Sequence, residues 1–398
     1  MRILMAVPKY PLPIIGGLER QAHELAKALV RRGLAVHALS GRFERGQQEV
    51  EIIDGIRVHR LKWIEFRPAR FLLSPFSLAR ILYRLKREVD LVHVHNLGWF
   101  GAFVTLFAKA LGLPVITKLP NFGDNGIPGM RRRRFGFLYV ALLKRSDTII
   151  AMTPESVAEL AGIGYPTSRV LKVTNGIALT PESPPTPRAS QPQMLHVIFV
   201  GRLAEEKDLP GLLHAWVAVK LRATRPVKLR LIGDGPQAAE LRGLAVALDL
   251  GETVEFFGYC GNVPAELAKA DLFVLPSYRE GNSNAILEAM RARLPIIATR
   301  VGGASIQVGS EGERFLVPPG DRDALADRLV ELIEDETLRL RLGAAMRERI
   351  ESVFAIDRIA AIYEQAYELI LSGRREQIGQ INPALFSPGE AVDLKCAG

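Results

Sequence analysis

The chain reads "DLFVLPSYREGNSNAILEAMRARLPIIAT" over residues 271–299, and this stretch decides the fold. An apolar run over 272–275 ends at Pro276, which predicts a buried strand with a sharp end. A polar turn follows, and apolar residues then recur with helical spacing from about Ala285. The apolar run 295–299 predicts a second strand. A strand, a helix and a strand in this order indicate neighbouring parallel strands of an α/β sheet.

Two carboxylates, Glu280 and Glu288, flank the start of the predicted helix. In open α/β sheets, ligands bind at the carboxyl ends of the strands. A helix start offers unpaired N–H groups and a positive dipole end, which suit a phosphate. Because carboxylates repel phosphate, these two are better suited to accept hydrogen bonds from hydroxyls. The pattern therefore predicts a ligand that carries both phosphates and sugar hydroxyls.

Strands alternate with helices in both halves of the chain, which predicts parallel sheets covered by helices on both faces. The segment 181–193, "PESPPTPRASQPQ", holds five prolines and no core-forming residue, and is interpreted as a linker. We expect a first domain at 1–180 and a second at 194–354. An amphipathic helix at about 355–371 is expected to pack back on the first domain, and a polar, mobile tail is expected from Ser372. Predicted strands lie at about 3–7, 35–40, 91–95, 115–118, 148–152, 195–200, 228–232, 253–257, 271–275 and 295–299, and predicted first-domain helices at about 18–32 and 99–111.

Charge is divided unevenly between the halves. Residues 1–180 carry 27 Lys and Arg against 13 Asp and Glu, whereas residues 181–398 carry 25 against 30. The first half is therefore expected to meet an anionic partner. No apolar run reaches the roughly 20 residues that span a bilayer, and Cys260 and Cys396 form no metal or redox motif. A reducing cytoplasm is the expected compartment.

The basic half contains two prominent segments. One is "WIEFRPARFLLSPFSLARILYRLKR", residues 63–87, and the other is the run Arg131 to Arg134. Interleaved aromatic and basic residues are typical of a surface that binds anionic membranes. A core helix with a solvated basic face explains them equally well. Nucleic acid is a poorer explanation, since no recognised binding motif accompanies the charges.

Gly-containing junctions recur where predicted strands end: "PIIGGLE", "VGRLAEEKD", "LIGDGPQ" and "TRVGGAS". Each alone is more often a turn than a phosphate cradle, and only their convergence at strand ends is informative. In the second of them, Arg202 and Lys207 could clamp a diphosphate. The alternative is a solvated loop in which Glu205 and Glu206 pair with these cations.

Taken in order, "VGRLAEEKD", "LIGDGP", "EFFGYC", "LFVLPSYREGNSNAILEAM", "LPIIATRVGG" and "LVPPGD" resemble the retaining, nucleotide-sugar-dependent glycosyltransferases of family 4. The resemblance covers roughly residues 1–370 and is denser in the second domain. Its most specific element is the pair of glutamates, Glu280 and Glu288, separated by seven residues. It implies the GT-B architecture, an α/β fold of two Rossmann-like doubly wound domains.

The resemblance also implies roles for individual residues. Arg202 and Lys207 would hold the donor diphosphate, Glu280 would bind the transferred sugar and Glu288 the ribose. Transfer would proceed with retention at the anomeric carbon and without a metal, because the two cations and a helix N-terminus take the metal's electrostatic role. No cofactor is implied; the donor would be a UDP-, GDP- or dTDP-sugar. The remaining donor-binding residues would be Gly16, Gly17, Gly233, Asp234, Gly258, Tyr259, Gly281, Asn282, Ser283 and Asn284.

The first domain departs from the family pattern where a His is common after the strand at 115–117. The sequence there is "TKLPNFGDNG". The candidate acceptor-side residues are His95, Lys118, Asn121 and Asp124, and a core histidine is an equally good interpretation of His95. Three further departures are Ala178 in place of Asp, Ile306 in place of Glu, and Arg293 in place of Gly.

The leading hypothesis is a glycosyltransferase that acts on a lipid-linked saccharide or glycolipid in the assembly of cell-surface polysaccharide or lipopolysaccharide, peripheral on the inner face of the cytoplasmic membrane. A dinucleotide-dependent oxidoreductase would need a G-x-G-x-x-G turn after the first strand, and "PKYPLPIIGGLE" is too long and wrongly spaced. A sugar-nucleotide epimerase of the same architecture and a non-catalytic nucleotide-sugar-binding, membrane-associated protein remain as alternatives.

Overall fold

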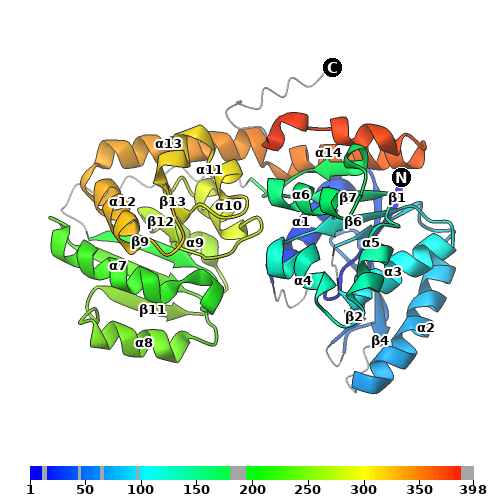
Figure 1. Ribbon diagram of the computed structural model, residues 1–398, viewed down its shortest axis with the longest axis horizontal. Helices are drawn as coiled ribbons and strands as arrows, with labels where there is room; N and C mark the ends of the chain where they lie inside the picture. Colours follow the sequence, from blue (N-terminus) through cyan, green and yellow to red (C-terminus); the bar gives the residue numbers. More distant parts are fainter. Residues whose placement is uncertain (11–15, 44–45, 63–66, 96–97, 180–193, 387–398) are drawn as a thin grey trace. The chain divides into compact units, whose positions relative to one another are not determined.

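The structure is a computed structural model that describes residues 1–10, 16–43, 46–62, 67–95, 98–179 and 194–386. The chain forms two compact units: unit 1 comprises Met1–Ala178 and Ala355–Gly398, and unit 2 comprises Leu179–Phe354. Each unit is a sheet covered by helices (Figure 1). The fold class expected from the sequence, two doubly wound α/β units, is confirmed. The linker expected at 181–193 lies outside the described residues.

The sheet of unit 1 has the strand order β3-β4-β2-β1-β5-β6-β7-β8. Its described strands pair in parallel except β3, which is antiparallel to β4. The strand order reverses between β1 and β5, so the loops that follow these two strands flank the switch point where such sheets bind ligands. The strands are β1 (Arg2–Ala6), β2 (Ala35–Arg42), β3 (Val50–Ile53), β4 (Ile56–Lys62), β5 (Leu91–Val94), β6 (Val115–Leu119), β7 (Thr148–Ala151) and β8 (Val170–Lys172).

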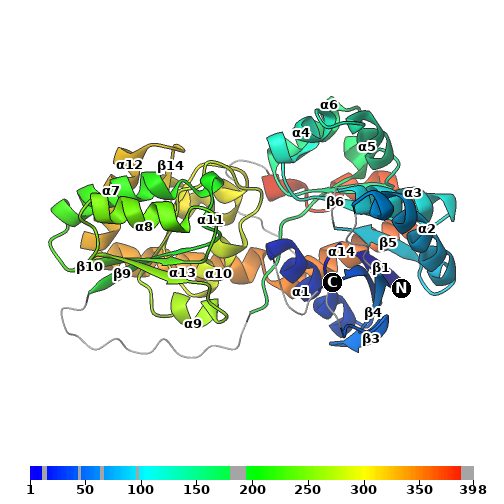
Figure 2. The same cartoon turned by 90° about the horizontal axis from the view of Figure 1, so that it is seen from below.

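Helices cover both faces of this sheet. Along β1, Ile3 and Met5 join the apolar cluster under α1 and α14, whereas Leu4 and Ala6 join the cluster under α2 and α3. Figure 2 shows α1 and α14 on one side of the unit and α4, α5 and α6 on the other. Burial on both faces explains why the strands are continuous apolar runs rather than alternating ones. The helices are α1 (Gly17–Arg31), α2 (Arg67–Leu85), α3 (Trp99–Ala110), α4 (Ile127–Arg131), α5 (Gly136–Leu143), α6 (Pro154–Gly162) and α14 (Ile356–Leu371), with the short 3-10 helices η1 (Gly123–Asn125) and η2 (Thr167–Arg169).

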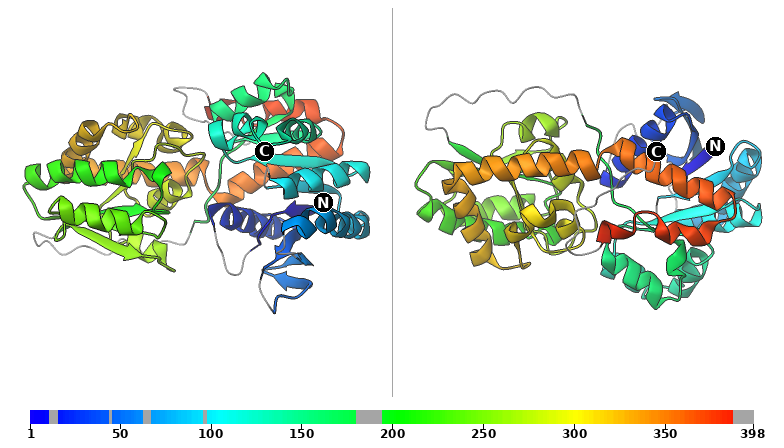
Figure 3. Two further views of the ribbon diagram at one scale, coloured as in Figure 1. Left: turned by 60° about the horizontal axis from the view of Figure 1, so that its bottom comes forward. Right: turned by 90° about the horizontal axis from the view of Figure 1, so that it is seen from above.

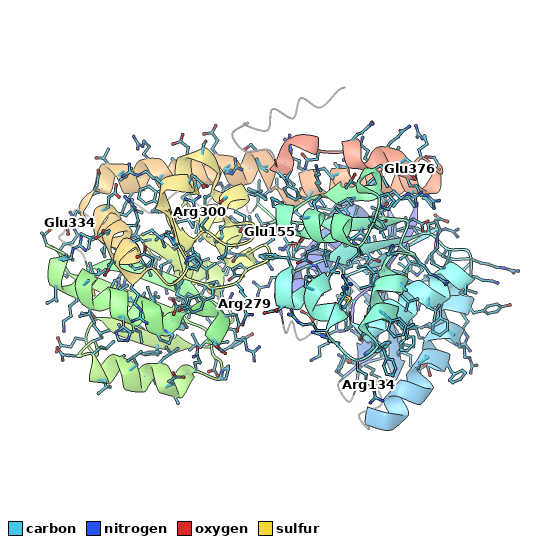
Figure 4. The ribbon with its side chains drawn as sticks, viewed as in Figure 1. Arg134, Glu155, Arg279, Arg300, Glu334 and Glu376 are labelled. Atoms are coloured by element: carbon cyan, nitrogen blue, oxygen red, sulfur yellow. The ribbon has the colours of Figure 1, made fainter. Side chains whose placement is uncertain are left out.

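The segment after α14 is ordered on unit 1, at least to residue 386. It forms the 3-10 helices η5 (Arg375–Gln380) and η6 (Pro383–Phe386), and Ile378 and Ile381 are buried in the same cluster as α14. Glu376, which Figure 4 labels, forms an ion pair with Arg169. The expectation of a mobile tail from Ser372 is therefore wrong for this part of the chain. The isoleucines among its polar residues are what anchor it.

Unit 2 has the strand order β11-β10-β9-β12-β13-β14, and all of its pairings are parallel. The order reverses between β9 and β12. Figures 2 and 3 show α7 and α8 on one face of the sheet and α13 on the other. The strands are β9 (Leu195–Val200), β10 (Val227–Ile232), β11 (Val254–Gly258), β12 (Leu272–Leu275), β13 (Ile296–Thr299) and β14 (Leu316–Val317). The helices are η3 (Glu205–Lys207), α7 (Leu209–Arg222), α8 (Ala238–Ala247), α9 (Val263–Leu267), α10 (Asn284–Arg291), α11 (Ala304–Gly312), η4 (Glu313–Phe315), α12 (Arg322–Glu334) and α13 (Glu336–Val353).

A pair of buried histidines should make unit 1 sensitive to acid. His37 Nδ1 and His59 Nε2 lie 3.1 Å apart, and burial lowers the pKa of His37 and lowers that of His59 to about 4. Between about pH 6.5 and pH 4, these histidines are protonated in the unfolded chain but not in the folded one. The free energy of unfolding therefore falls as the pH falls through this window. Both proteins should become less stable between pH 7 and pH 5. The loss in free energy of unfolding should be about 1 kcal/mol smaller for His59→Gln than for the wild type. Urea unfolding at both pH values measures this, and equal losses would contradict it.

Candidate functional site

The charged loops of unit 2 meet at its switch point. β9 leads into the loop that carries Arg202 and Lys207, and β12 leads into the loop that carries Glu280. Because β9 and β12 are adjacent and parallel, both loops leave the same edge of the sheet. Tyr278 N donates a backbone hydrogen bond to Glu206 O (2.9 Å), which ties the two loops together. Two segments about 75 residues apart thus form one surface.

Lys207 and Glu280 form an ion pair in this surface. Lys207 Nζ donates to Glu280 Oε1, and both side chains are largely buried, 16% and 13% exposed. Ser277 Oγ donates to the same carboxylate oxygen at 2.8 Å. A charge in this setting is weakly screened, so the ammonium would attract a phosphate and the carboxylate would accept hydroxyl protons more strongly than at the open surface.

The N-terminus of α10 is held by a residue that sequence reasoning missed. Ser283 caps the helix, its Oγ accepting from Ile286 N at 3.5 Å. Gln307, fully buried on α11, accepts from Ser283 N (3.3 Å) and donates to Ser283 O (2.7 Å). One amide side chain thus fixes both backbone groups of the cap. The sequence does contain a sign of this role. Gln307 lies at one of the otherwise apolar positions of α11, and a buried amide side chain needs hydrogen-bond partners.

Gly302 and Gly303 lie against the backbone of the Glu280 loop. A Cβ on Gly302 would lie 2.0 Å from Glu280 O, and the φ of +54° is one that side chains rarely adopt. Gly303 N donates to Gly281 O at 2.8 Å. The "VGG" motif therefore has a structural reason here: only glycine allows the loop after β13 to support the loop after β12 so closely.

The loops after β9, β10 and β11 are joined by backbone contacts. Leu203 N donates to Asp234 O (3.0 Å), and Gly233 N donates to Gly258 O (2.8 Å). Gly233 has a φ of +136°, and a Cβ there would lie 1.8 Å from Gly201 O. Asp234 is exposed, and Tyr259 is 80% exposed beside these loops. The structure therefore brings four of the predicted donor-binding residues, Gly233, Asp234, Gly258 and Tyr259, to the same sheet edge as Arg202.

The remaining predicted donor residues lie around the start of α10. Gly281, Asn282 and Ser283 are buried, and Asn284 is half-buried at the first position of the helix. Glu288 is half-buried one turn further along α10, and Arg202 is exposed. Beside this site is a small hollow, lined by Asp208, Gly211, Pro276, Thr299, Val317, Pro318, Gly320, Asp321, Arg322 and Leu325.

Unit 1 separates its four candidate residues into two groups. His95 directly follows β5, and Lys118 lies on β6. Both are buried on the face of the sheet that α14 covers. Lys118 Nζ donates a hydrogen bond to Asn175 Oδ1 at 2.7 Å. Asn121 and Asp124 are exposed beyond β6, and Asp124 forms an ion pair with Arg132. Gly16 and Gly17 stand at the start of α1, after the switch-point strand β1.

The basic segments of unit 1 carry exposed aromatic side chains. On α2, Leu78, Leu82 and Leu85 are buried, whereas Phe76 and Tyr83 are 76% and 61% exposed. Residues 63–66 lie outside the described residues. Arg131 to Arg134 are exposed, and they are followed by exposed Phe135, Phe137 and Leu138; Figure 4 labels Arg134. Both α2 and α5 pack against α3, so the two surfaces lie on the same side of the sheet. Across the described chain, no helix is both long and apolar enough to cross a bilayer.

This chain has two doubly wound units, and charged and Gly-containing loops lie at the switch point of the second. This arrangement is typical of the GT-B class of glycosyltransferases. Two family models match the chain: "Glycosyl transferase 4-like domain" over residues 16–176 and "Glycosyl transferases group 1" over residues 188–349. The chain therefore belongs to the family 4 type of GT-B glycosyltransferases, and it is an enzyme that transfers glycosyl groups.

Similar proteins agree with this assignment. Glycogen synthase of Mycobacterium tuberculosis is 28% identical over 94% of this chain and 96% of its own. The lipopolysaccharide core biosynthesis glycosyltransferase LpsD of Rhizobium meliloti is 26% identical over 89% and 95%. The solved structure of Anabaena HepE in complex with UDP-glucose has a TM-score of 0.73 and 22% identity over 94% of this chain and 100% of that one, which shows the shared fold.

Proposed function

We propose that this enzyme moves a sugar from a nucleotide-sugar donor to a lipid-linked saccharide or glycolipid, with retention at the anomeric carbon. The observation that carries the donor assignment is the Lys207–Glu280 ion pair at the switch point of unit 2, next to the N-terminus of α10. Lys207 supplies a cation for a diphosphate, and Glu280 supplies a carboxylate for sugar hydroxyls. The two groups are directly hydrogen-bonded to each other. Similarity to HepE, a structure solved with UDP-glucose, supports the same donor class.

Each part of the site has a distinct task in this proposal. Lys207 and Arg202 bind the diphosphate, and the N-terminus of α10 adds backbone N–H donors. Glu280, held by Ser277, accepts from hydroxyls of the transferred sugar. Glu288 accepts from the ribose, and the loops after β10 and β11 border the base. The donor is a UDP-, GDP- or dTDP-sugar.

The chemical step exchanges one bond for another on the same face of the sugar. The bond between the anomeric carbon and the phosphate oxygen breaks, and a bond to the acceptor oxygen forms. The acceptor proton passes to the departing phosphate. Lys207 and Arg202 stabilise the negative charge that develops on the diphosphate, a task that needs no metal ion.

The surface of unit 1 supports the acceptor and the location that we propose. Exposed aromatic side chains beside clustered arginines suit the interface of an anionic membrane, where rings enter the head-group layer and cations meet lipid phosphates. LpsD, a relative named for lipopolysaccharide core biosynthesis, supports an acceptor of this kind. We infer a peripheral enzyme on the inner face of the cytoplasmic membrane, active in cell-surface polysaccharide or lipopolysaccharide assembly.

Neutralising the arginine run tests the membrane surface. Replacing Arg131 to Arg134 with Gln should weaken binding to vesicles that contain anionic lipid by about tenfold or more, because each basic group near such a surface contributes about 1 kcal/mol. Wild-type binding should also weaken as salt is added. Co-sedimentation measures both. The control combines Lys220→Gln with Arg222→Gln, on α7 of unit 2, and should bind the vesicles as the wild type does. Equal binding by the two variants would show that the arginine run is only a solvated surface and does not bind membranes.

A donor panel tests the proposed activity. Purified enzyme is incubated with UDP-, GDP- and dTDP-sugars, with and without a bacterial lipid extract, and the nucleotide and the sugar are both quantified. Transfer predicts lipid-dependent release of one nucleotide, with the sugar recovered in the lipid phase. Recovery of a free epimer, or nucleotide release without sugar in the lipid phase, would contradict transfer to a lipid-linked acceptor.

A further inference from the structure

A polar cluster is buried at the carboxyl edge of the unit 1 sheet, on the face that α14 covers. It brings together His93 and His95 from β5 and its end, Lys118 from β6, Asn175 after β8, and Tyr363 and Tyr367 from α14. The rings of His93 and His95 stack with centroids 3.9 Å apart, and Tyr367 Oη lies 2.8 Å from His93 Nδ1. All six side chains are less than one-tenth exposed.

Lys118 is a buried cation whose charge is not neutralised nearby. Its ammonium donates to Asn175 Oδ1 at 2.7 Å, and within the part of the chain that the structure describes no carboxylate forms an ion pair with it. Burial alone lowers the pKa of Lys118 to about 8, so the side chain is still mostly protonated at neutral pH. A buried charge is ordinarily paired, because leaving water costs more than one neutral hydrogen bond returns.

The neighbours of Lys118 cannot supply the missing negative charge. Burial, together with the charge of Lys118, lowers the pKa values of His93 and His95 well below the ordinary range, so both imidazoles are neutral. His93 Nε2, His95 Nε2 and Tyr363 Oη are buried and, among the described residues, have no hydrogen-bond partner. Three unsatisfied polar atoms beside an unneutralised ammonium would destabilise a purely structural core. The same arrangement suits a site that binds a polar, anionic group.

We propose that Lys118, positioned by Asn175 and flanked by His95, is an anion-binding group of the enzyme that receives a phosphate oxygen of a diphosphate. The position supports this, because His95 directly follows the switch-point strand β5 and Lys118 lies on the adjacent strand β6. This inference rests on the proposed function for the source of that diphosphate, which is the lipid-linked acceptor, since the diphosphate of the donor is assigned to unit 2.

The test compares the wild type with Lys118→Met, which keeps the length of the side chain and removes its charge. One arm titrates UDP, GDP and dTDP; the other measures co-sedimentation with phosphatidylcholine vesicles that contain a polyprenyl diphosphate. We expect binding to the diphosphate-containing vesicles to weaken at least tenfold, and the affinity for UDP, GDP and dTDP to stay unchanged. Lys144→Met, an exposed lysine after α5, is the control and should change neither.

Stability separates an anion site from a structural lysine. Because the folded pKa of Lys118 lies below that of the unfolded chain, its charge opposes folding below about pH 8, and this penalty is relieved as the pH rises from 8 towards 10.5. The thermal midpoint of Lys118→Met should therefore not fall at pH 7, and the binding it loses should also weaken in the wild type above pH 8. Wild-type binding of Lys118→Met to the diphosphate-containing vesicles, or a lowered midpoint with unchanged affinity, would overturn the proposal. If the donor panel shows no transfer but diphosphate binding still requires Lys118, only the proposed function fails.

Discussion

Lys207→Ala should lower the rate of nucleotide release by about 10²- to 10³-fold, the effect of removing one group that stabilises developing charge. Glu280→Ala should cause a loss of similar size, because the sugar would lose its hydrogen-bond acceptor. The two side chains form one ion pair, so each single variant leaves a partly buried charge without its partner. The double variant should therefore be as inactive as either single variant but more stable than both.

The matched control is Lys220→Ala, which removes a lysine of the same unit whose ion pair with Asp249 is exposed. It should keep wild-type activity, since exposed pairs contribute little. Circular dichroism and thermal midpoints show whether each variant is folded. Wild-type rates in a folded Lys207→Ala or Glu280→Ala protein would remove both residues from the site.

Gly302→Ala should destabilise unit 2 by about 2–4 kcal/mol and also reduce activity. The new methyl group would lie 2.0 Å from Glu280 O at a φ of +54°, so the Glu280 loop has to move or the backbone of residue 302 has to change conformation. Either response displaces the carboxylate from Lys207. Urea unfolding and nucleotide release measure the two effects.

Gly243→Ala is the control for Gly302→Ala. Gly243 lies inside α8, and a Cβ there would meet nothing within 4 Å. Alanine should leave activity unchanged and raise stability by about 0.5–1 kcal/mol, because it favours the helix. A Gly302→Ala protein as stable and active as Gly243→Ala would show that the loop after β13 does not hold the loop after β12.

Ten strands could be predicted from the sequence because both faces of each sheet are covered, whereas only four of the α-helices, α1, α3, α10 and α14, were predicted. Complete burial makes a strand a continuous apolar run, as in 272–275 and 296–299. The elements that were missed lack this signal. β14 has only two residues, and β3 and β4 form a hairpin at the edge of the sheet with partly exposed residues. Such elements depend on their neighbours more than on their own sequence.

The sequence indicated the charged residues of the proposed donor site, but it did not indicate the residues that support them. Gln307 acts on Ser283 from 24 residues away, and only the fold reveals the contact. Arg293, where the family commonly has Gly, adopts a φ of +60°, a conformation that is costly for a side chain. Arg293 therefore occupies a left-handed backbone conformation that glycine adopts at lower cost.

In unit 1, the sequence placed Lys118 on a strand and His95 at the end of one, but it also grouped them with Asn121 and Asp124. Strand alternation explains the outcome. Lys118 shares the α14 face with Ile116, whereas Asn121 and Asp124 follow the strand and are exposed. Whether a polar strand residue is buried depends on what covers its face, and α14 comes from the far end of the chain.

We propose above that the Lys207–Glu280 surface of unit 2 holds the diphosphate of the donor. The most direct measurement is a calorimetric titration of UDP, GDP and dTDP against the matching nucleosides, for the wild type and for Lys207→Met. We predict that the wild type binds one diphosphate at least tenfold more tightly than its nucleoside, and that Lys207→Met loses this preference while nucleoside affinity is unchanged. An undiminished preference for the diphosphate in folded Lys207→Met would contradict the account.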